Sequence, residues 1–328
     1  MVDLGHKRTN KKLKKLESRL NSIYRDAYKT VKSKLSNHLA KYEEQDKIMR
    51  EKVNNNEISE SSYLSWRHAQ MMQTRSFTDL GDTLAAELTR TTEIAAGMIN
   101  GHTEDVYCLN MNYGTYEVES GTRINTSFAL YDHATIENLM KKDPQIIPQV
   151  NPNIPKMQQW NQKNITSAVA TGILSGDSIP QIASRLEGVT NMNLSQSVRA
   201  ARTYTTAAEN KGRVDSYQRA EKMGIHMQQQ WLATVDTRTR PSHIALDHKK
   251  IKVGEKFPNG CRFPGDPDAP PEERWNCRCT LIAALDDFEY EGNERAMNLP
   301  AGITFEQWKS WGRETWKSTS QSKTEQKK

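Results

Sequence analysis

Four side chains in the C-terminal third of the chain carry the donor atoms of a zinc site. They are His243, Cys261, Cys277 and Cys279. Structural zinc takes four thiolate or imidazole ligands, and its binding stabilises segments that contain few large apolar residues. The surrounding stretch, 231–282, is of this kind, because it holds half of the twelve prolines of the chain and many turn-forming residues. We therefore predict a structural zinc site, with His248 as an alternative to Cys261.

Two other interpretations of these residues remain open. Cys277 and Cys279 alternate along the chain, so in a strand they would share one face and could be buried thiols without a metal. Their Cys-x-Cys spacing is also less typical of zinc than Cys-x2-Cys. Asp236, His243 and Asp247 could instead form an acid–base set, since His243 and Asp247 would share one face of a helix.

The remaining sequence features favour a protein that acts by binding. We find no nucleophile elbow, Walker loop or dinucleotide fingerprint, so we expect no enzymatic activity. The N-terminus lacks the apolar stretch of a secretory signal, which predicts a cytoplasmic protein with reduced cysteines. No run of eighteen apolar residues occurs, and we therefore expect no membrane span.

Short elements must position the candidate ligands. They are a strand at 228–235, a short helix starting at Pro241 or Ser242, a strand at 251–257 and a strand through Cys277 and Cys279. A long helix at 195–223, ended by Gly224, leads into the first strand. Two shorter helices are predicted before it, at 160–174 and 178–188.

The first hundred residues carry two helical stripes of apolar side chains. The stripes run through 10–53 and 66–98, with apolar residues at spacings of three and four. An asparagine-rich stretch separates them, where Ser59 or Ser61 can cap the second helix. We expect that second helix to end at Gly101. The two stripes predict a long antiparallel helical pair.

The middle region, 102–155, shows a different pattern. Apolar residues alternate with period two around Gly114, which predicts a hairpin. A short helix is expected at 134–142. Three prolines between 148 and 155 then predict a linker.

Positive charge is concentrated near the N-terminus, although the net charge of the chain is only +6. Residues 7–34 include eleven lysines and arginines and two acidic residues. We predict that Lys11, Lys12, Lys14 and Lys15 contact the phosphates of double-stranded DNA without reading its sequence. The alternative is an ordinary solvated helix face.

The C-terminal residues 286–328 combine an amphipathic segment with a polar tail. The apolar residues of the segment are Ile303, Phe305, Trp308, Trp311 and Trp316. This segment either docks on a partner or folds back on the core of its own chain. Residues 317–328 are polar and are expected to be disordered.

The loop-rich stretch resembles a known family. Trp-x4-Asp-x-Arg-Thr-Arg-x2-His-x3-Asp at 231–247, Pro-Gly-Asp-Pro at 264–267 and Asn-Cys-Arg-Cys at 276–279 are similar to the signature of phage Mu F-like minor head proteins, the phage head morphogenesis family. The matching residues are Trp231, Asp236, Arg238, Arg240, His243, Asp247, Asn276, Cys277 and Cys279. Many relatives have Cys-x2-Cys at the turn where this chain has Arg240 and His243. His243 keeps one of the two metal positions and Arg240 does not.

The resemblance implies a structural component of a tailed-phage virion. Its partners would be the portal protein, the inner surface of the major capsid protein and packaged double-stranded DNA. Such a protein is made in the bacterial host cytoplasm, lies inside the phage head and could be ejected with the genome. The competing function is a metal-dependent nuclease or a toxin-like effector enzyme.

We therefore predict a mainly helical α+β fold, with long N-terminal helices and a C-terminal compact α+β module rich in loops. The expected divisions are a basic helical arm at 1–101, a middle region and linker at 102–155, a Mu F-like module at 156–285, and an amphipathic segment with a basic tail at 286–328.

Overall fold

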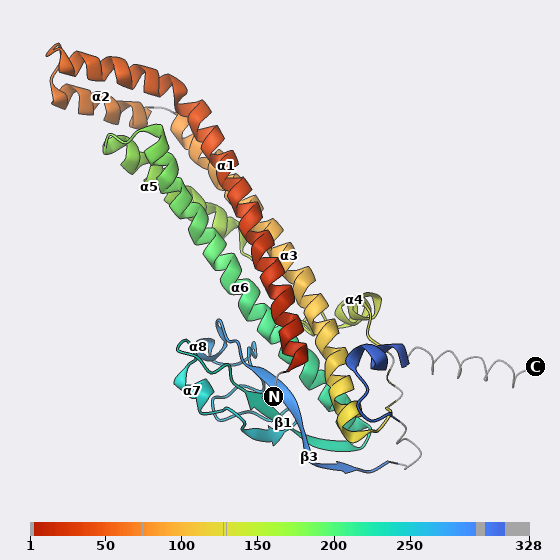
Figure 1. Cartoon of the computed structure of the whole chain (residues 1–328). Coiled ribbons are helices and arrows are strands. Elements are labelled where there is room, and N and C mark those ends of the chain that lie inside the picture. Colours follow the sequence, from red (N-terminus) through yellow and green to blue (C-terminus); the bar gives the residue numbers. More distant parts are fainter. Residues whose placement is uncertain (1–2, 74, 127, 129, 293–298, 312–328) are drawn as a thin grey trace, which may run out of the picture. The chain divides into compact units, whose positions relative to one another are not determined.

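The computed structural model describes residues 3–73, 75–126, 128, 130–292 and 299–311 (Figure 1). Its helices are α1 (Leu4–Asn54), α2 (Glu60–Gln73), α3 (Arg75–Thr122), α4 (His133–Lys142), α5 (Ile154–Leu174), α6 (Ile179–Lys222), α7 (Pro241–Ile244) and α8 (Pro271–Arg274). Its strands are β1 (Ile225–Leu232), β2 (Lys250–Lys252) and β3 (Thr280–Tyr290). The fold is α+β and mainly helical, as the sequence predicts.

The chain forms two compact units. The sheet unit comprises the described residues within 1–15, 99–149 and 199–328, and the helical unit those within 16–98 and 150–198. The long helices α1, α3 and α6 each contribute residues to both units. None of the helices in the described part of the chain is long and apolar enough to cross a membrane.

The core of the helical unit is built from the apolar stripes of α1, α3, α5 and α6. On α1 the fully buried residues Val31, Leu35 and Leu39 recur at a spacing of four, so they lie on one face of the helix. The hydroxyl oxygen of buried Tyr24 also shares hydrogen bonds with the hydroxyls of Thr92, at 3.0 Å, and Ser197, at 2.8 Å. The predicted stripe of α1 is therefore confirmed as a core face.

The start of α2 also follows the sequence. The backbone N–H of Ser62 donates to the hydroxyl of Ser59 at 3.1 Å. This contact satisfies an amide that has no partner within the helix. Ser59 is thus the cap that the sequence predicts.

The hairpin predicted around Gly114 is wrong, because α3 continues past Gly101 to Thr122. Every side chain from 106 to 115 is buried or half-buried. A helix covered on several sides has no clean helical period of apolar and polar residues. The apolar residues of this segment therefore alternate with the period of a strand although the segment is helical. Likewise α6 runs without a break through Gly188, where we predicted a stop.

Close packing of α3 against α6 in the sheet unit depends on Gly212. A Cβ atom at this position would lie 2.7 Å from the carbonyl oxygen of Tyr107 and 3.0 Å from the backbone nitrogen of Met111. Both contacts are with backbone, which cannot move aside as a flexible side chain can. The two helix backbones therefore meet at a distance that only glycine allows.

We predict that Gly212→Ala destabilises the sheet unit by about 1–3 kcal/mol, as expected for overpacking a close helix contact. The matched control is Gly101→Ala, whose Cβ would have no neighbour within 4 Å. This control should stabilise α3 by about 0.5–1 kcal/mol, because alanine loses less backbone entropy than glycine. Urea unfolding followed by circular dichroism measures both. Equal effects of the two substitutions would contradict this account of the packing.

The sheet is antiparallel with the order β2-β1-β3. Gly224, at a φ of +84°, lets the chain turn from the end of α6 into β1. In β1, Gln229 pairs with Ile251 of β2 and with Ala283 of β3. The strand β3 extends to residue 290, past the boundary at 285 that the sequence suggested. Figure 1 shows the strands and the short helices α7 and α8 gathered beside the C-terminal half of α6.

The amphipathic C-terminal segment folds back on its own core. Residues 305–311 are helical, and Phe305 and Trp308 are buried against α3. The indole nitrogen of Trp308 donates to the carboxylate of Glu119 at 2.6 Å. These side chains are therefore not available as a docking face. Trp316 and the tail 317–328 lie outside the described residues.

A candidate metal centre beside the sheet

Three of the four predicted zinc ligands lie together in the sheet unit. The donor atoms of His243, Cys277 and Cys279 all lie within 4.8 Å of one another, and the three residues are buried. The Nδ1 atom of His243 is 3.5 Å from each of the two sulfur atoms. One imidazole nitrogen and two sulfurs converging at this distance form the donor set of a soft or borderline metal such as zinc.

The segment between β1 and β2 fixes the position of the imidazole. Pro241 begins α7, whose short turn carries His243. The indole of Trp231 packs edge-on against the imidazole with 5.2 Å between the ring centroids. The guanidinium of Arg240 donates to the carbonyl oxygen of Trp275 at 2.5 Å, which ties this loop to the segment before the cysteines.

Glu273 orients the imidazole, and the sequence interpretation missed it. Its carboxylate lies 2.9 Å from the Nε2 atom of His243 and accepts hydrogen bonds from Ser242 and Asn259. Burial raises the pKa of Glu273, but these hydrogen bonds and His243 outweigh burial, so the net pKa is lowered. A carboxylate at Nε2 favours the tautomer whose free Nδ1 lone pair faces the sulfurs.

The two thiols differ in acidity. A hydrogen bond between the sulfur atoms, together with one from His243, lowers the pKa of Cys279 to about 5. The same contact and burial raise the pKa of Cys277. One thiolate is therefore stabilised at neutral pH, which is the form that binds a metal. The strand predicted through the two cysteines is wrong in its start, because β3 begins at Thr280 and both cysteines lie in the segment before it. Arg278, between them, pairs with Asp236.

The other two predicted ligands are not part of this set. Cys261 is fully buried in the same apolar cluster, but its sulfur does not lie within 4.8 Å of all three donor atoms. His248 is exposed, and its Nε2 atom lies 3.5 Å from a carboxylate oxygen of Asp247. In the described part of the chain the set therefore has three protein ligands.

The structure does not bring the proposed acid–base set together. Asp236 accepts two hydrogen bonds of 2.6 Å from Arg278 and one of 2.9 Å from the backbone of Arg238, and these contacts lower its pKa. Asp247 accepts a hydrogen bond of 2.8 Å from the backbone of Ala233. Both aspartates therefore hold loops in place, and neither forms a hydrogen bond or ion pair with His243.

The remaining signature residues also have structural contacts. Arg238 is exposed and lies 3.7 Å from Asp236. Asn276 has a φ of +55°, and its backbone N–H donates to Thr203 of α6 at 3.1 Å. This turn places the following cysteines against the helix. Signature positions of this kind stabilise the module, whereas the three buried ligands could also hold a metal.

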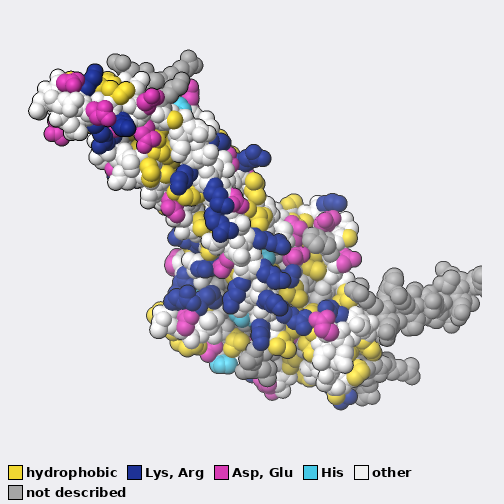
Figure 2. Space-filling view, turned by 45° about the horizontal axis from the view of Figure 1, so that its top comes forward, with side chains coloured by type: hydrophobic (Ala, Val, Ile, Leu, Met, Phe, Trp, Pro, Cys, Tyr) yellow, Lys and Arg dark blue, Asp and Glu magenta, His cyan; other side chains and the backbone are white. Residues whose placement is uncertain are grey.

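The predicted DNA-contacting lysines fall into two groups. Many Lys and Arg side chains are visible on the face drawn in Figure 2. Lys11 and Lys14 line a cavity of the sheet unit. Lys12 instead forms a 3.1 Å ion pair with Asp105, and Lys15 is exposed outside that cavity. Only two of the four lysines therefore line this cavity.

Comparison with known proteins finds a family that is similar to this part of the chain. Residues 163–282 match the family model described as Phage Mu protein F like protein. This segment is similar to that family, as its signature residues predict, and it includes His243, Cys277 and Cys279.

Two curated proteins extend the comparison. The chain is 24% identical over 279 residues to the minor head protein GP7 of Bacillus phage SPP1, which covers 82% of each protein. It is 30% identical over 182 residues to the NAD(+)--arginine ADP-ribosyltransferase EFV of Enterococcus faecalis (strain ATCC 700802 / V583), covering 54% of this chain and 36% of the transferase. The chain thus spans about a third of the length of that transferase. No solved structure matches the chain.

Proposed function

We propose that this chain is a minor head protein of a tailed bacteriophage and acts by binding rather than by catalysis. The observation that carries the proposal is the match to a phage minor head protein over 82% of both chains. Its partners are the portal protein, the inner surface of the major capsid protein and packaged double-stranded DNA. The protein is made in the host cytoplasm, is enclosed in the head and leaves with the genome.

The contacts of the Mu F-like module support a structural role. Its charged signature residues bind other groups of the same module, as Asp236 does with Arg278 and Arg240 does with Trp275. Groups that are already paired hold a surface rigid and are not poised to react with a substrate. We therefore assign the module the role of a rigid platform for partner proteins.

We further propose that His243, Cys277 and Cys279 hold a structural zinc ion. The donor set, its burial and the carboxylate behind the imidazole support this assignment. Bound zinc would connect α7 to the start of β3, two segments joined by a loop-rich stretch with little regular structure. The fixed connection would stabilise the module.

We predict that Glu273→Gln lowers zinc affinity by about 10- to 100-fold, because a carboxylate behind a ligating imidazole raises its basicity. Zinc affinity is measured by competition with a chromogenic chelator. Glu272→Gln is the control, since Glu272 is exposed on the same short helix and should leave the affinity unchanged. If both variants bind zinc like the wild type, Glu273 does not support a metal site.

Cross-linking of purified phage particles tests the proposed location and partners. Mass spectrometry of the cross-linked peptides should find this chain joined to the portal protein and to the inner face of the capsid. Protection of the chain from protease in intact particles, and its loss on opening them, would place it inside the head. Absence of the chain from full particles would overturn the proposal.

An enzymatic function is the second candidate, and two observations favour it. One relative is named an ADP-ribosyltransferase. Moreover, three protein ligands with a fourth position open is the arrangement of catalytic zinc sites. Incubation with labelled NAD and an arginine-containing acceptor tests the transferase, and nicking of supercoiled DNA tests a nuclease. An activity that is lost in His243→Ala would establish this function in place of the structural one.

A further inference from the structure

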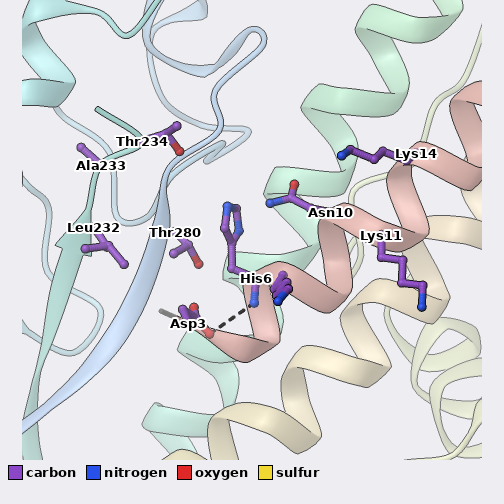
Figure 3. Close-up of a pocket in the computed structure, with 10 residues that line it drawn as sticks. Asp3, His6, Asn10, Lys11, Lys14, Leu232, Ala233, Thr234 and Thr280 are labelled. Carbon is purple, nitrogen blue, oxygen red and sulfur yellow. Dashed lines mark hydrogen bonds between the residues drawn. The ribbon is translucent and has the colours of Figure 1, made fainter. Parts of the chain in front are cut away.

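A cavity of about 530 Å³ opens beside the first turns of α1 in the sheet unit (Figure 3). One wall is α1, which contributes Lys7, Lys11 and Lys14. The opposite wall is the chain that leaves β1, at 232–234, together with Thr280 at the start of β3. The lysines are spaced four and three residues apart, so they lie along one side of the helix.

These three lysines have no acidic partner among the described residues, whereas other cations of the same helix do. Arg8 pairs with Glu306 at 2.7 Å, and Lys12 pairs with Asp105 at 3.1 Å. Among the described residues, Arg8 and Lys12 therefore have an acidic partner, whereas the three lysines that line the cavity keep their charge unpaired. Unpaired cations beside a hollow attract and concentrate anions.

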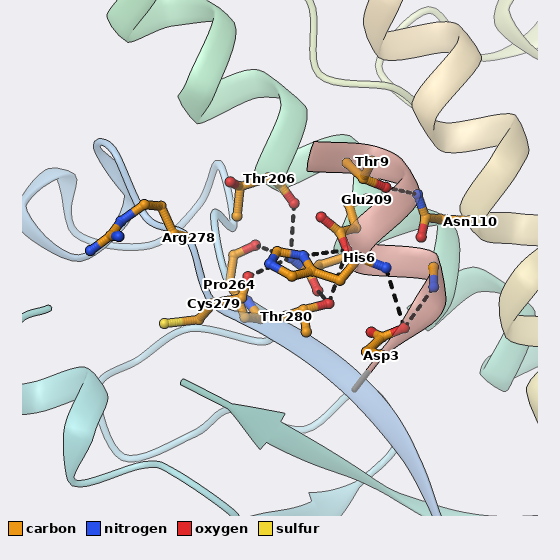
Figure 4. A network of polar contacts seen from close by, with 12 residues as sticks. Asp3, His6, Thr9, Asn110, Thr206, Glu209, Pro264, Arg278, Cys279 and Thr280 are labelled. Carbon is orange, nitrogen blue, oxygen red and sulfur yellow. Dashed lines mark hydrogen bonds and ion pairs between the residues drawn. The ribbon is translucent and has the colours of Figure 1, made fainter. Parts of the chain in front are cut away.

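The carboxylates near the cavity are neutralised by their own partners. Asp3, which lines the cavity, lies 2.6 Å from the buried guanidinium of Arg213. Glu209 lies 2.9 Å from His6 and accepts a hydrogen bond of 3.1 Å from Thr280 (Figure 4). Burial lowers the pKa of His6, but the charge and hydrogen bond of Glu209, together with the charge of Asp3, outweigh burial, so the net pKa is raised. The acidic groups therefore do not cancel the charge of the three lysines.

We propose that this cavity and its lysine row bind the phosphodiester backbone of DNA. The proposal deepens the proposed function by giving the DNA contact a defined site. From Lys7 to Lys14 the helix rises about 10 Å, and one strand of duplex DNA carries a phosphate every ~3.4 Å along its axis. The row therefore spans about three phosphates. Amide and hydroxyl groups of Asn10 and Thr234 add hydrogen-bonding capacity without reading bases.

The site differs from the run of lysines that the sequence suggested. Lys11 and Lys14 belong to it, and Lys7 joins them. Lys12 and Lys15 do not line the cavity. A pair of double variants, equal in charge and close in sequence, therefore separates the cavity from general positive charge.

The test compares Lys11→Gln/Lys14→Gln with Lys12→Gln/Lys15→Gln in the full chain. Binding to a fluorescent 30-base-pair duplex is measured by anisotropy between 50 and 200 mM salt. Each lost phosphate contact lowers the slope of log affinity against log salt by about 0.9. We expect the cavity variant to lose about two units of slope and at least about tenfold in affinity at 50 mM salt. The Lys12/Lys15 variant should stay within about twofold of the wild type.

Three outcomes would overturn the assignment. Equal losses in the two variants would mean that general charge, rather than the cavity, attracts DNA. If the wild type binds the duplex and neither variant weakens this binding, the cavity is not the DNA site, although DNA is still a partner. Failure of the wild type to bind duplex would remove both the site and the proposed DNA contact. Thermal unfolding of each variant confirms that the fold is retained.

A competition experiment distinguishes a site for the phosphodiester backbone from a site for the free phosphate ion. Sodium phosphate is compared with sodium chloride at equal ionic strength. For a backbone site the two salts should compete equally with the duplex. Stronger competition by phosphate would indicate a pocket for the free ion and would overturn the backbone proposal.

Discussion

Zinc removal is expected to destabilise the sheet unit by several kcal/mol. A metal that binds only the folded state stabilises it by about 4 kcal/mol when its free concentration is 1,000 times Kd. The chain purified without chelators should contain zinc in equimolar amount by elemental analysis. A strong chelator, or Cys279→Ser, should abolish the zinc content and lower the unfolding temperature. Near-ultraviolet circular dichroism reports this transition, because the buried indole of Trp231 packs against His243.

The controls for zinc are the other two cysteines. Cys261→Ser lies in the same apolar cluster but outside the three-ligand set, and Cys108→Ser lies on α3. Both variants should retain zinc. If Cys261→Ser loses zinc, Cys261 is a zinc ligand after all. A zinc-free wild type whose stability does not respond to added zinc or chelator would mean that Cys277 and Cys279 are only small buried residues.

Arg213→Met is expected to destabilise the sheet unit by about 3–5 kcal/mol, the usual effect of removing one partner of a buried ion pair. The side chain of Arg213 is fully buried and lies 2.6 Å from a carboxylate oxygen of Asp3. It also donates to the carbonyl oxygen of Leu281 at 2.5 Å and to Asn110 at 3.2 Å. Its loss leaves a buried carboxylate and two buried acceptors without their donor. Urea unfolding measures the change in free energy.

Lys211→Met is the matched control for this prediction. Lys211 lies two residues away on α6 and pairs with Asp215 at 2.5 Å, but its side chain is 27% exposed. Water can replace its contacts, so the expected loss is about 1 kcal/mol or less. Asp3→Asn combined with Arg213→Met should recover part of the stability, because the unpaired charge is removed. Similar losses in the two single variants would show that burial of Arg213 does not matter.

Local patterns were sufficient to predict much of the fold. The stripe through Val31, Leu35 and Leu39 identified the core face of α1, and Gly224 identified the end of α6. Such features depend on residues within one or two turns of each other. The sequence did not predict that α3 continues past Gly101, because the buried positions of this part include polar residues such as Asn110. Its side-chain amide donates hydrogen bonds to the backbone of its own helix and to Thr9.

The candidate site was also predicted only where local sequence features identify its residues. His243, Cys277 and Cys279 were recognised by their donor chemistry and by the family signature. Glu273 was missed because its contact with the imidazole depends on how two loops meet, which no short spacing encodes. The ion pair between Lys12 and Asp105, which lie 93 residues apart, could not be predicted from the sequence either. The charge that remains free on α1 could be identified only from the three-dimensional arrangement.

The pairing of His6 with Glu209 sets the order in which the sheet unit can form during synthesis. The two residues are 203 positions apart in the chain. At about 5–20 residues per second on the ribosome, the first turns of α1 wait about 10–40 s for this partner. During that interval the lysines and apolar side chains of these turns lack their native contacts and are open to other molecules. Early capture of this segment would therefore delay maturation of the whole unit, which links its assembly to translation speed.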